Sequence, residues 1–104
     1  MRRNAKVDEN QPKIVEALRK AGAFVVITSQ LKNAFDILVA FQGKLFIMEI
    51  KDGEKPPSAR KLTDGEIKCK EGIEGAGCTY HIVLSVEEAL NVINENKWCY
   101  SPIK

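Results

Sequence analysis

Two runs of apolar residues, broken by a single polar pair, stand out near the middle of the chain. Residues 35–41 and 44–51 are rich in β-branched and aromatic side chains, and Gln42-Gly43 separates them. Apolar runs of this length with glycine at the break are typical of two strands joined by a tight turn. The pattern therefore predicts a β-hairpin across these residues.

The hairpin carries charged residues at positions that share one face. Side chains alternate between the two faces of a strand, so Asp36 lies with Leu38, while Glu49 and Lys51 lie with Ile47. Burying an unpaired carboxylate in such apolar strands costs several kcal/mol. We therefore expect the two carboxylates and the lysine to lie close together on one side of the sheet, where a chemical role would account for their charges.

A helical pattern precedes the hairpin. Apolar residues recur at helical spacing over 14–18, which predicts a helix from about Asp8 or Gln11 to Ala21. Gly22 supplies the left-handed residue that commonly ends a helix. Gln11 lies whole turns before the apolar stripe, so it projects inward, near the charged end of the hairpin.

Further strands are expected before and after the hairpin. The continuous β-branched run 24–28 predicts a well-buried first strand, and residues 79–84 predict the last strand. Polar residues 29–33 connect the first strand to the hairpin. Residues 52–58 contain Gly and Pro, which predicts a loop.

Two capping boxes mark the starts of later helices. Thr63 with Glu66 opens a short helix that we expect to end near residue 71, because three glycines follow between residues 72 and 77. Ser85 with Glu88 opens a terminal helix. The expected order is helix, three strands, helix, strand and helix, which is an α/β fold.

Length and composition limit the class of protein. At 104 residues the chain is expected to be one domain, residues 1–104, and its 44% hydrophobic and 29% charged residues are ordinary for a globular protein. No apolar run approaches the roughly 20 residues of a membrane span. The basic start leads into acidic residues without an apolar segment, so we expect neither a signal peptide nor a membrane partner. Three cysteines without pairing spacing favour a reducing, cytoplasmic location.

The distribution of charged residues along the chain says more about possible partners than the net charge does. The net charge of +2 is too small to indicate a nucleic-acid-binding protein by itself. Basic residues nevertheless gather after the hairpin, where they could follow a phosphate backbone, and the alternative is a solvated loop and helix face. These residues are Lys51, Lys55, Arg60, Lys61, Lys68 and Lys70.

The acidic pair suggests metal chemistry. Two carboxylates offer the hard oxygen ligands that Mg²⁺ or Mn²⁺ prefers, with water and substrate oxygens completing the coordination. A lysine beside a metal-bound water can orient or deprotonate it, or neutralise charge on a phosphorus centre. The alternative is a surface Asp36 at a strand start and a solvated pair between Glu49 and Lys51.

Asp36 followed by Glu49-Ile50-Lys51 resembles the PD-(D/E)XK phosphodiesterase superfamily of restriction enzymes and Holliday junction resolvases, and within it the small phage type of VRR-NUC domain. The similarity extends over most of the chain. It includes Asn10-Gln11, Lys20-Ala21-Gly22, Phe35-Asp36-Ile37-Leu38, Asp52-Gly53, Pro57-Ser58-Ala59-Arg60 and Leu62-Thr63. The resemblance implies a restriction-endonuclease-like core in which helices flank a mixed central sheet.

The same resemblance implies a metal-dependent DNA endonuclease that acts on branched DNA such as a four-way junction. Asp36 and Glu49 would hold Mg²⁺ or Mn²⁺ with the Ile50 carbonyl, and Lys51 would position the attacking water. The phosphates of the DNA backbone would be contacted by Ser29, Asn33, Lys55, Arg60 and Lys61.

One position departs from the family pattern, in which the first helix contributes a glutamate. Gln11 stands there, and its uncharged side chain would orient a metal-bound water. Glu9 would point about 160° away around a continuing helix. Glu66 stands where the family often has glutamine, and helix capping is its better supported role. A metal or general-base role for His81 stays open.

Alternative functions remain. A catalytically silent DNA-binding or assembly module is credible because Gln11 replaces an acid. A restriction-type nuclease would need recognition elements for which 104 residues leave little room. Cutting two symmetrically placed strands predicts a homodimer, with Trp98 and Tyr100 as candidate interface residues. The competing interpretation is that this apolar tail covers its own sheet edge.

Overall fold

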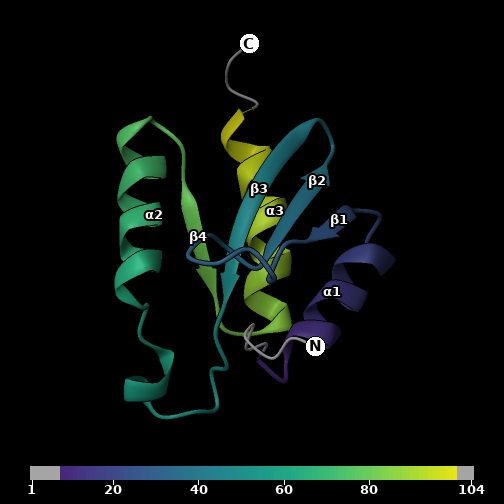
Figure 1. Ribbon diagram of the computed structural model, residues 1–104. Coiled ribbons are helices and arrows are strands. Elements are labelled where there is room, and N and C mark those ends of the chain that lie inside the picture. The colour runs from purple at the N-terminus through teal and green to yellow at the C-terminus, as the bar shows by residue number, and fades with distance from the viewer. Residues whose placement is uncertain (1–7, 101–104) are drawn as a thin grey trace.

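The computed structural model describes residues 8–100, with side chains as far as residue 95. Its elements follow the expected order (Figure 1). They are α1 (Gln11–Lys20), β1 (Phe24–Ile27), β2 (Ile37–Phe41), β3 (Lys44–Ile50), the 3₁₀ helix η1 (Pro57–Arg60), α2 (Asp64–Gly75), β4 (Tyr80–Val83) and α3 (Val86–Tyr100). Trp98 and Tyr100 fall beyond the side chains so described.

The four strands form one mixed sheet in the order β1-β2-β3-β4. β1, β2 and β3 pair antiparallel, and β4 runs parallel to β3. The turn between β2 and β3 has positive φ at both central residues, 50° at Gln42 and 84° at Gly43. This geometry matches the right-handed twist of the flanking strands, so it fixes the register of the predicted hairpin.

The hydrophobic core lies between one face of the sheet and two helices. α1 and α3 pack against each other and against this face, while α2 stands beside β4 (Figure 1). The core side chains are those of Ile14, Val15, Leu18, Ala23, Val25, Ile37, Val39, Phe46, Met48, Ile50, Val83, Ala89 and Ile93. The expected α/β fold with a mixed sheet flanked by helices is therefore confirmed.

The expectation of a well-buried first strand is wrong. Only Val25 of β1 is buried, whereas Phe24 is 69% and Ile27 51% exposed. β1 is an edge strand, and α1 and α3 cover one face of the sheet. A continuous apolar run does not by itself distinguish this position from a central strand.

The expected end of the second helix is also wrong. α2 continues through Gly72 to Gly75 and stops only at Ala76, which Gly77 follows with φ of +93°. A glycine in a helix costs only about 1 kcal/mol, so it does not necessarily terminate one. The predicted capping box at Thr63 and Glu66 is present and supports the start of this helix.

The first helix begins at Gln11 with Asn10 as its N-cap, and Pro12 lies in the first turn as expected. Neither Asp8 nor Asn10 caps it through a side chain; instead the Gln11 N–H donates to the Asp8 carbonyl at 3.0 Å. Within the described part of the chain, every helix is too short or too polar to cross a lipid bilayer.

Candidate active site

A polar cleft opens where the start of β2, the end of β3 and the first turn of α2 meet. Its volume is about 810 Å³. The lining residues are Asp8, Ser29, Gln30, Leu31, Lys32, Asn33, Ala34, Phe35, Asp36, Glu49, Ile50, Lys51, Lys55, Ala59, Lys61, Thr63 and Glu66. All three charged residues of the predicted hairpin face therefore reach one cleft.

Asp36 is fixed by the backbone of the neighbouring strand. It directly precedes β2, and its Oδ2 accepts a hydrogen bond from the Ile50 N–H at 2.8 Å. Its own N–H donates to the Met48 carbonyl at 3.0 Å. Burial raises the pKa of Asp36, and the Ile50 N–H offsets part of that rise. The hairpin register thus holds this carboxylate against the end of β3.

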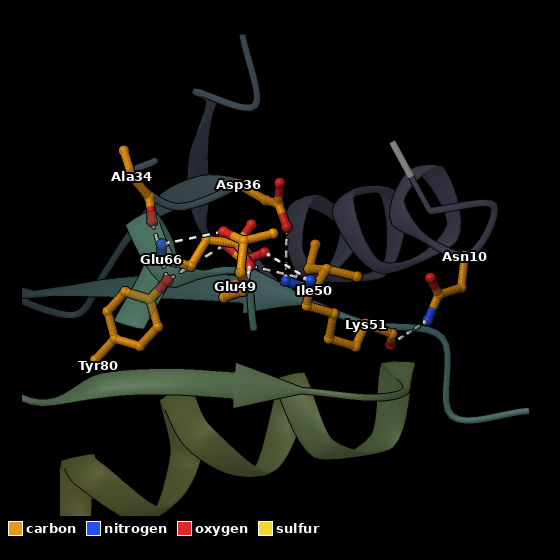
Figure 2. A network of polar contacts seen from close by, with 9 residues as sticks. Asn10, Ala34, Asp36, Glu49, Ile50, Lys51, Glu66 and Tyr80 are labelled. Carbon is orange, nitrogen blue, oxygen red and sulfur yellow. Dashed lines mark hydrogen bonds and ion pairs between the residues drawn. The ribbon is translucent and has the colours of Figure 1, made fainter. Parts of the chain in front are cut away.

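Glu49 is the most buried carboxylate of the cleft, with 3% of the residue exposed. Burial raises its pKa to about 8, and the nearby negative charges of Asp36 and Glu66 add to the rise. The Tyr80 hydroxyl lies 3.4 Å from Glu49 Oε1 and donates to the Ala34 carbonyl at 2.9 Å (Figure 2). Tyr80 therefore links β3, β4 and the loop before Asp36.

Lys51 lies between two carboxylates. Its Nζ is 3.4 Å from Glu49 Oε2 and 3.3 Å from Glu66 Oε1 (Figure 2). Burial alone would lower the pKa of Lys51, but the attraction of these carboxylates outweighs it and raises that pKa. The lysine is therefore held as an ammonium ion at the cleft.

Glu66 has two functions in the structure. Its Oε1 accepts the Thr63 N–H at 3.0 Å, which is the predicted capping role. The same oxygen accepts from Lys51 Nζ at 3.3 Å, a contact that the sequence did not predict. Burial would raise the pKa of Glu66, but the Thr63 N–H and Lys51 together lower it. Glu66 is therefore an anion beside the lysine.

No family model and no curated protein matches the chain. A solved structure described as "VRR_NUC domain" superposes with a TM-score of 0.60, covering 84% of this chain and 97% of that one at 17% identity. The chain has the VRR_NUC fold. The expected restriction-endonuclease-like architecture is thereby supported at the level of fold.

Within the VRR_NUC fold of this chain, Gln11 lies outside the lining of the cleft and lines a separate hollow with Val15 and Ile27. It is 3% exposed, and its Nε2 donates to Ser29 Oγ at 3.4 Å. Ser29 lines the cleft whereas Gln11 does not, so Gln11 reaches the cleft through Ser29. Gln11 Oε1 is buried without a hydrogen-bond partner among the described residues. Glu9 is exposed and faces a different hollow, beside Asp52.

Most of the residues expected to contact DNA line the same cleft. Ser29, Asn33, Lys55 and Lys61 line it, but Arg60 does not: it is half-buried at the end of η1. Lys68 and Lys70 lie on α2 outside the lining.

Lys32 and Asp8 also line the cleft, although neither was predicted from the sequence as a site residue. The polar connection over 29–33 contains Lys32, so a search for basic residues flanking the hairpin on both sides would have found it. Asp8 precedes the first helix, and no local pattern indicates which way it faces.

His81 lies on the other face of the sheet. It pairs with Met48, whereas Glu49 pairs with Ile82, so the alternation of β3 and β4 separates the histidine from the carboxylates. Its ring centroid is 6.0 Å from that of Phe46. Burial lowers the pKa of His81. This geometry does not support the metal or general-base role left open for it.

The donor set suits a hard divalent cation held by few protein ligands. No three His, Cys, Asp or Glu side chains within the described residues form a ready-made ligand cluster. Mg²⁺ commonly takes only one or two carboxylates and keeps several waters, so Asp36 and Glu49 with the Ile50 carbonyl fit this requirement. Burial is the main cause of the raised pKa of Glu49, and the negative charges of Asp36 and Glu66 add to it; a cation at this position would offset those charges.

Proposed function

We propose that this chain, as a single domain over residues 1–104, is a metal-dependent DNA endonuclease of the PD-(D/E)XK type. The observation that carries the proposal is the convergence of Asp36, Glu49 and Lys51 on one polar cleft. The VRR_NUC fold supports it, since the neighbour's name describes a nuclease domain.

Asp36, Glu49 and the Ile50 carbonyl would hold Mg²⁺ or Mn²⁺. When bound, the cation would supply a Lewis acid for the phosphate and lower the pKa of a water. Lys51 would orient that water or offset charge at phosphorus, because its ammonium is fixed 3.4 Å from Glu49. Gln11 acts through Ser29, at the wall of the cleft. In-line displacement needs only this alignment and charge neutralisation, without a covalent enzyme intermediate.

Polyanionic DNA suits the rim of the cleft. Lys32, Lys55 and Lys61 are exposed there, while the carboxylates are deeper. Exposed lysines attract phosphates by charge and release counterions, whereas hydroxyl and amide groups fix the position of the backbone. Ser29 and Asn33 supply such groups in the proposed complex.

The preferred substrate is branched DNA, such as a four-way junction, and the active species is a homodimer. The resemblance to a superfamily that includes Holliday junction resolvases supports the substrate, and the two strands to be cut are related by twofold symmetry. Apolar side chains are exposed on the sheet face opposite α1 and α3, including Phe24 at 69% and Leu45 at 70%. A second copy would cover them.

The proposal is tested with Asp36→Asn and Glu49→Gln, which preserve side-chain shape. Each should reduce Mg²⁺-dependent cleavage of a supercoiled plasmid and of a four-way junction by roughly 100-fold or more, since an uncharged amide is a poor ligand for a hard cation. Glu87→Gln, which changes an exposed carboxylate on α3, is the matched control and should retain activity.

Circular dichroism should show that the two cleft variants remain folded, because neither removes a core side chain. Full activity in either variant would contradict the assignment of the site. A wild-type protein that binds junction DNA but cuts nothing with either Mg²⁺ or Mn²⁺ would identify a silent binding module instead.

A further inference from the structure

Lys51, a member of the proposed catalytic set, is paired with Glu49, which is also a proposed metal ligand. Its ammonium lies 3.4 Å from Glu49 Oε2, and a divalent cation would draw that carboxylate away. The same cation would repel the ammonium. Lys51 therefore requires another negative charge if it is to stay at the cleft in the metal-bound state.

Glu66 is placed to provide that charge. It comes from the first turn of α2, and its Oε1 is 3.3 Å from Lys51 Nζ. The side chains of Lys51 and Glu66 are only 12% and 19% exposed, so solvent screens this pair weakly. By contrast, the pair of Lys70 and Glu74 on the same helix is 35% and 43% exposed.

The Glu66 carboxylate is held independently of Lys51. The Thr63 N–H donates to Glu66 Oε1 at 3.0 Å, and the Glu66 N–H donates to Thr63 Oγ1 at 3.2 Å. Gly65 packs so closely on Asn33 that a Cβ at residue 65 would overlap the Asn33 side chain. The first turn of α2 is thus fixed against the loop between β1 and β2.

We infer that Glu66 is a positioning residue that retains the Lys51 ammonium at the cleft when Glu49 binds a divalent cation. The inference rests on the proposed function. Glu66 acts through Lys51 rather than on the metal. Without the Glu66 charge, Lys51 would depend on Glu49 alone, and the cation would have to displace it.

A double-mutant cycle with Mn²⁺ calorimetry tests this inference. Glu66→Gln removes the charge but keeps an oxygen that can accept the Thr63 N–H. It should weaken Mn²⁺ binding roughly tenfold, the usual scale for a residue that supports a metal ligand. In a Lys51→Ala background, the same change should alter Mn²⁺ affinity by less than about twofold, because the mediating group is absent.

Glu74→Gln is the matched control. It removes a more exposed carboxylate of the same helix, which pairs with Lys70 rather than with Lys51, so it should leave Mn²⁺ affinity unchanged. A second readout is plasmid cleavage at saturating Mn²⁺, where Glu66→Gln should lower kcat more than it changes KM for DNA.

Unchanged Mn²⁺ affinity in Glu66→Gln would overturn the inference. So would an equal loss of affinity with and without Lys51, since that result would make Glu66 a direct ligand of the ion. Wild-type protein that binds no Mn²⁺ would overturn the proposed function as well, whereas normal wild-type binding confines the failure to Glu66.

Discussion

Glu49 is the residue at which burial and negative charge conflict most strongly. Its pKa is about 8 in the folded protein, compared with an ordinary value of 4.5. Between these values the folded state binds a proton at Glu49 that the unfolded state releases, so the contribution of Glu49 to stability falls as pH rises through this interval. The loss is on the order of a few kcal/mol across the full interval.

We therefore expect metal-free protein to become less stable between pH 5 and pH 8, the window set by the Glu49 pKa of about 8. Urea unfolding at several pH values measures this trend. Glu49→Gln should flatten it, because the amide does not titrate. The same pH dependence in the wild type and in Glu49→Gln would contradict the raised pKa of Glu49.

Sequence alone placed Asp36, Glu49 and Lys51 on one face because strand alternation is a local property. The contacts that hold them were not accessible in the same way. Tyr80 reaches Glu49 only because β4 pairs in parallel with β3 in one particular register. Glu66 showed a local capping signal, but its contact with Lys51 depends on how α2 returns to the sheet.

At the scale of elements, substitutions at two glycines show how the backbone conformation at each position affects stability. Gly43 has φ of +84° in the hairpin turn, whereas Gly72 lies inside exposed α2 with nothing within 4 Å of an added Cβ. Gly43→Ala should destabilise the protein by about 1 kcal/mol, since alanine is strained at positive φ. Gly72→Ala should stabilise α2 by up to about 1 kcal/mol.

Thermal or urea unfolding of the two variants compares the same Gly-to-Ala substitution at a positive-φ turn position and at a position inside a helix. Gly77→Ala, which has φ of +93° after α2, serves as a second positive-φ control and should behave like Gly43→Ala. Equal effects at Gly43 and Gly72 would show that backbone conformation does not determine the cost.

The sequence predicts best those elements whose ends have a local signal. The hairpin and the starts of α2 and α3 have local signals in their turn and capping residues, and these elements are present. The capping box of α2 is complete, whereas at α3 the Glu88 N–H donates to Ser85 Oγ but the Glu88 carboxylate accepts from the Leu84 N–H instead of that of Ser85. The end of α2 and the burial of β1 depend on weaker effects. A glycine only biases a helix end, and a strand's burial depends on its neighbours in the sheet.

At the scale of the whole molecule, the two faces of the sheet differ. α1 and α3 cover one face, while apolar side chains of the other face, Phe24, Val26, Leu45 and Ile82, are 39% to 70% exposed. Exposed apolar surface of this kind commonly marks an interface. The proposed homodimer would place it against a second copy.

We expect light scattering at micromolar concentration to show a dimer, and Phe24→Ser with Leu45→Ser to shift it toward monomer. Ile27→Ser is the matched control: it changes another exposed residue of β1, 51% exposed, that pairs with Ile37 on the opposite face. A wild-type monomer that cuts both strands of a junction in concert would contradict the dimer.

The loose attachment of α2 has a further consequence. None of its residues is buried, yet its first turn carries Glu66, the partner of Lys51. A segment with so little buried surface opens locally at a free energy well below that of global unfolding. Amide hydrogen exchange should therefore be fast along the later turns of α2 and slower in the first. An opening event that reaches the first turn would release Lys51 from Glu66, so the fraction of molecules with an assembled cleft depends on the local stability of that turn.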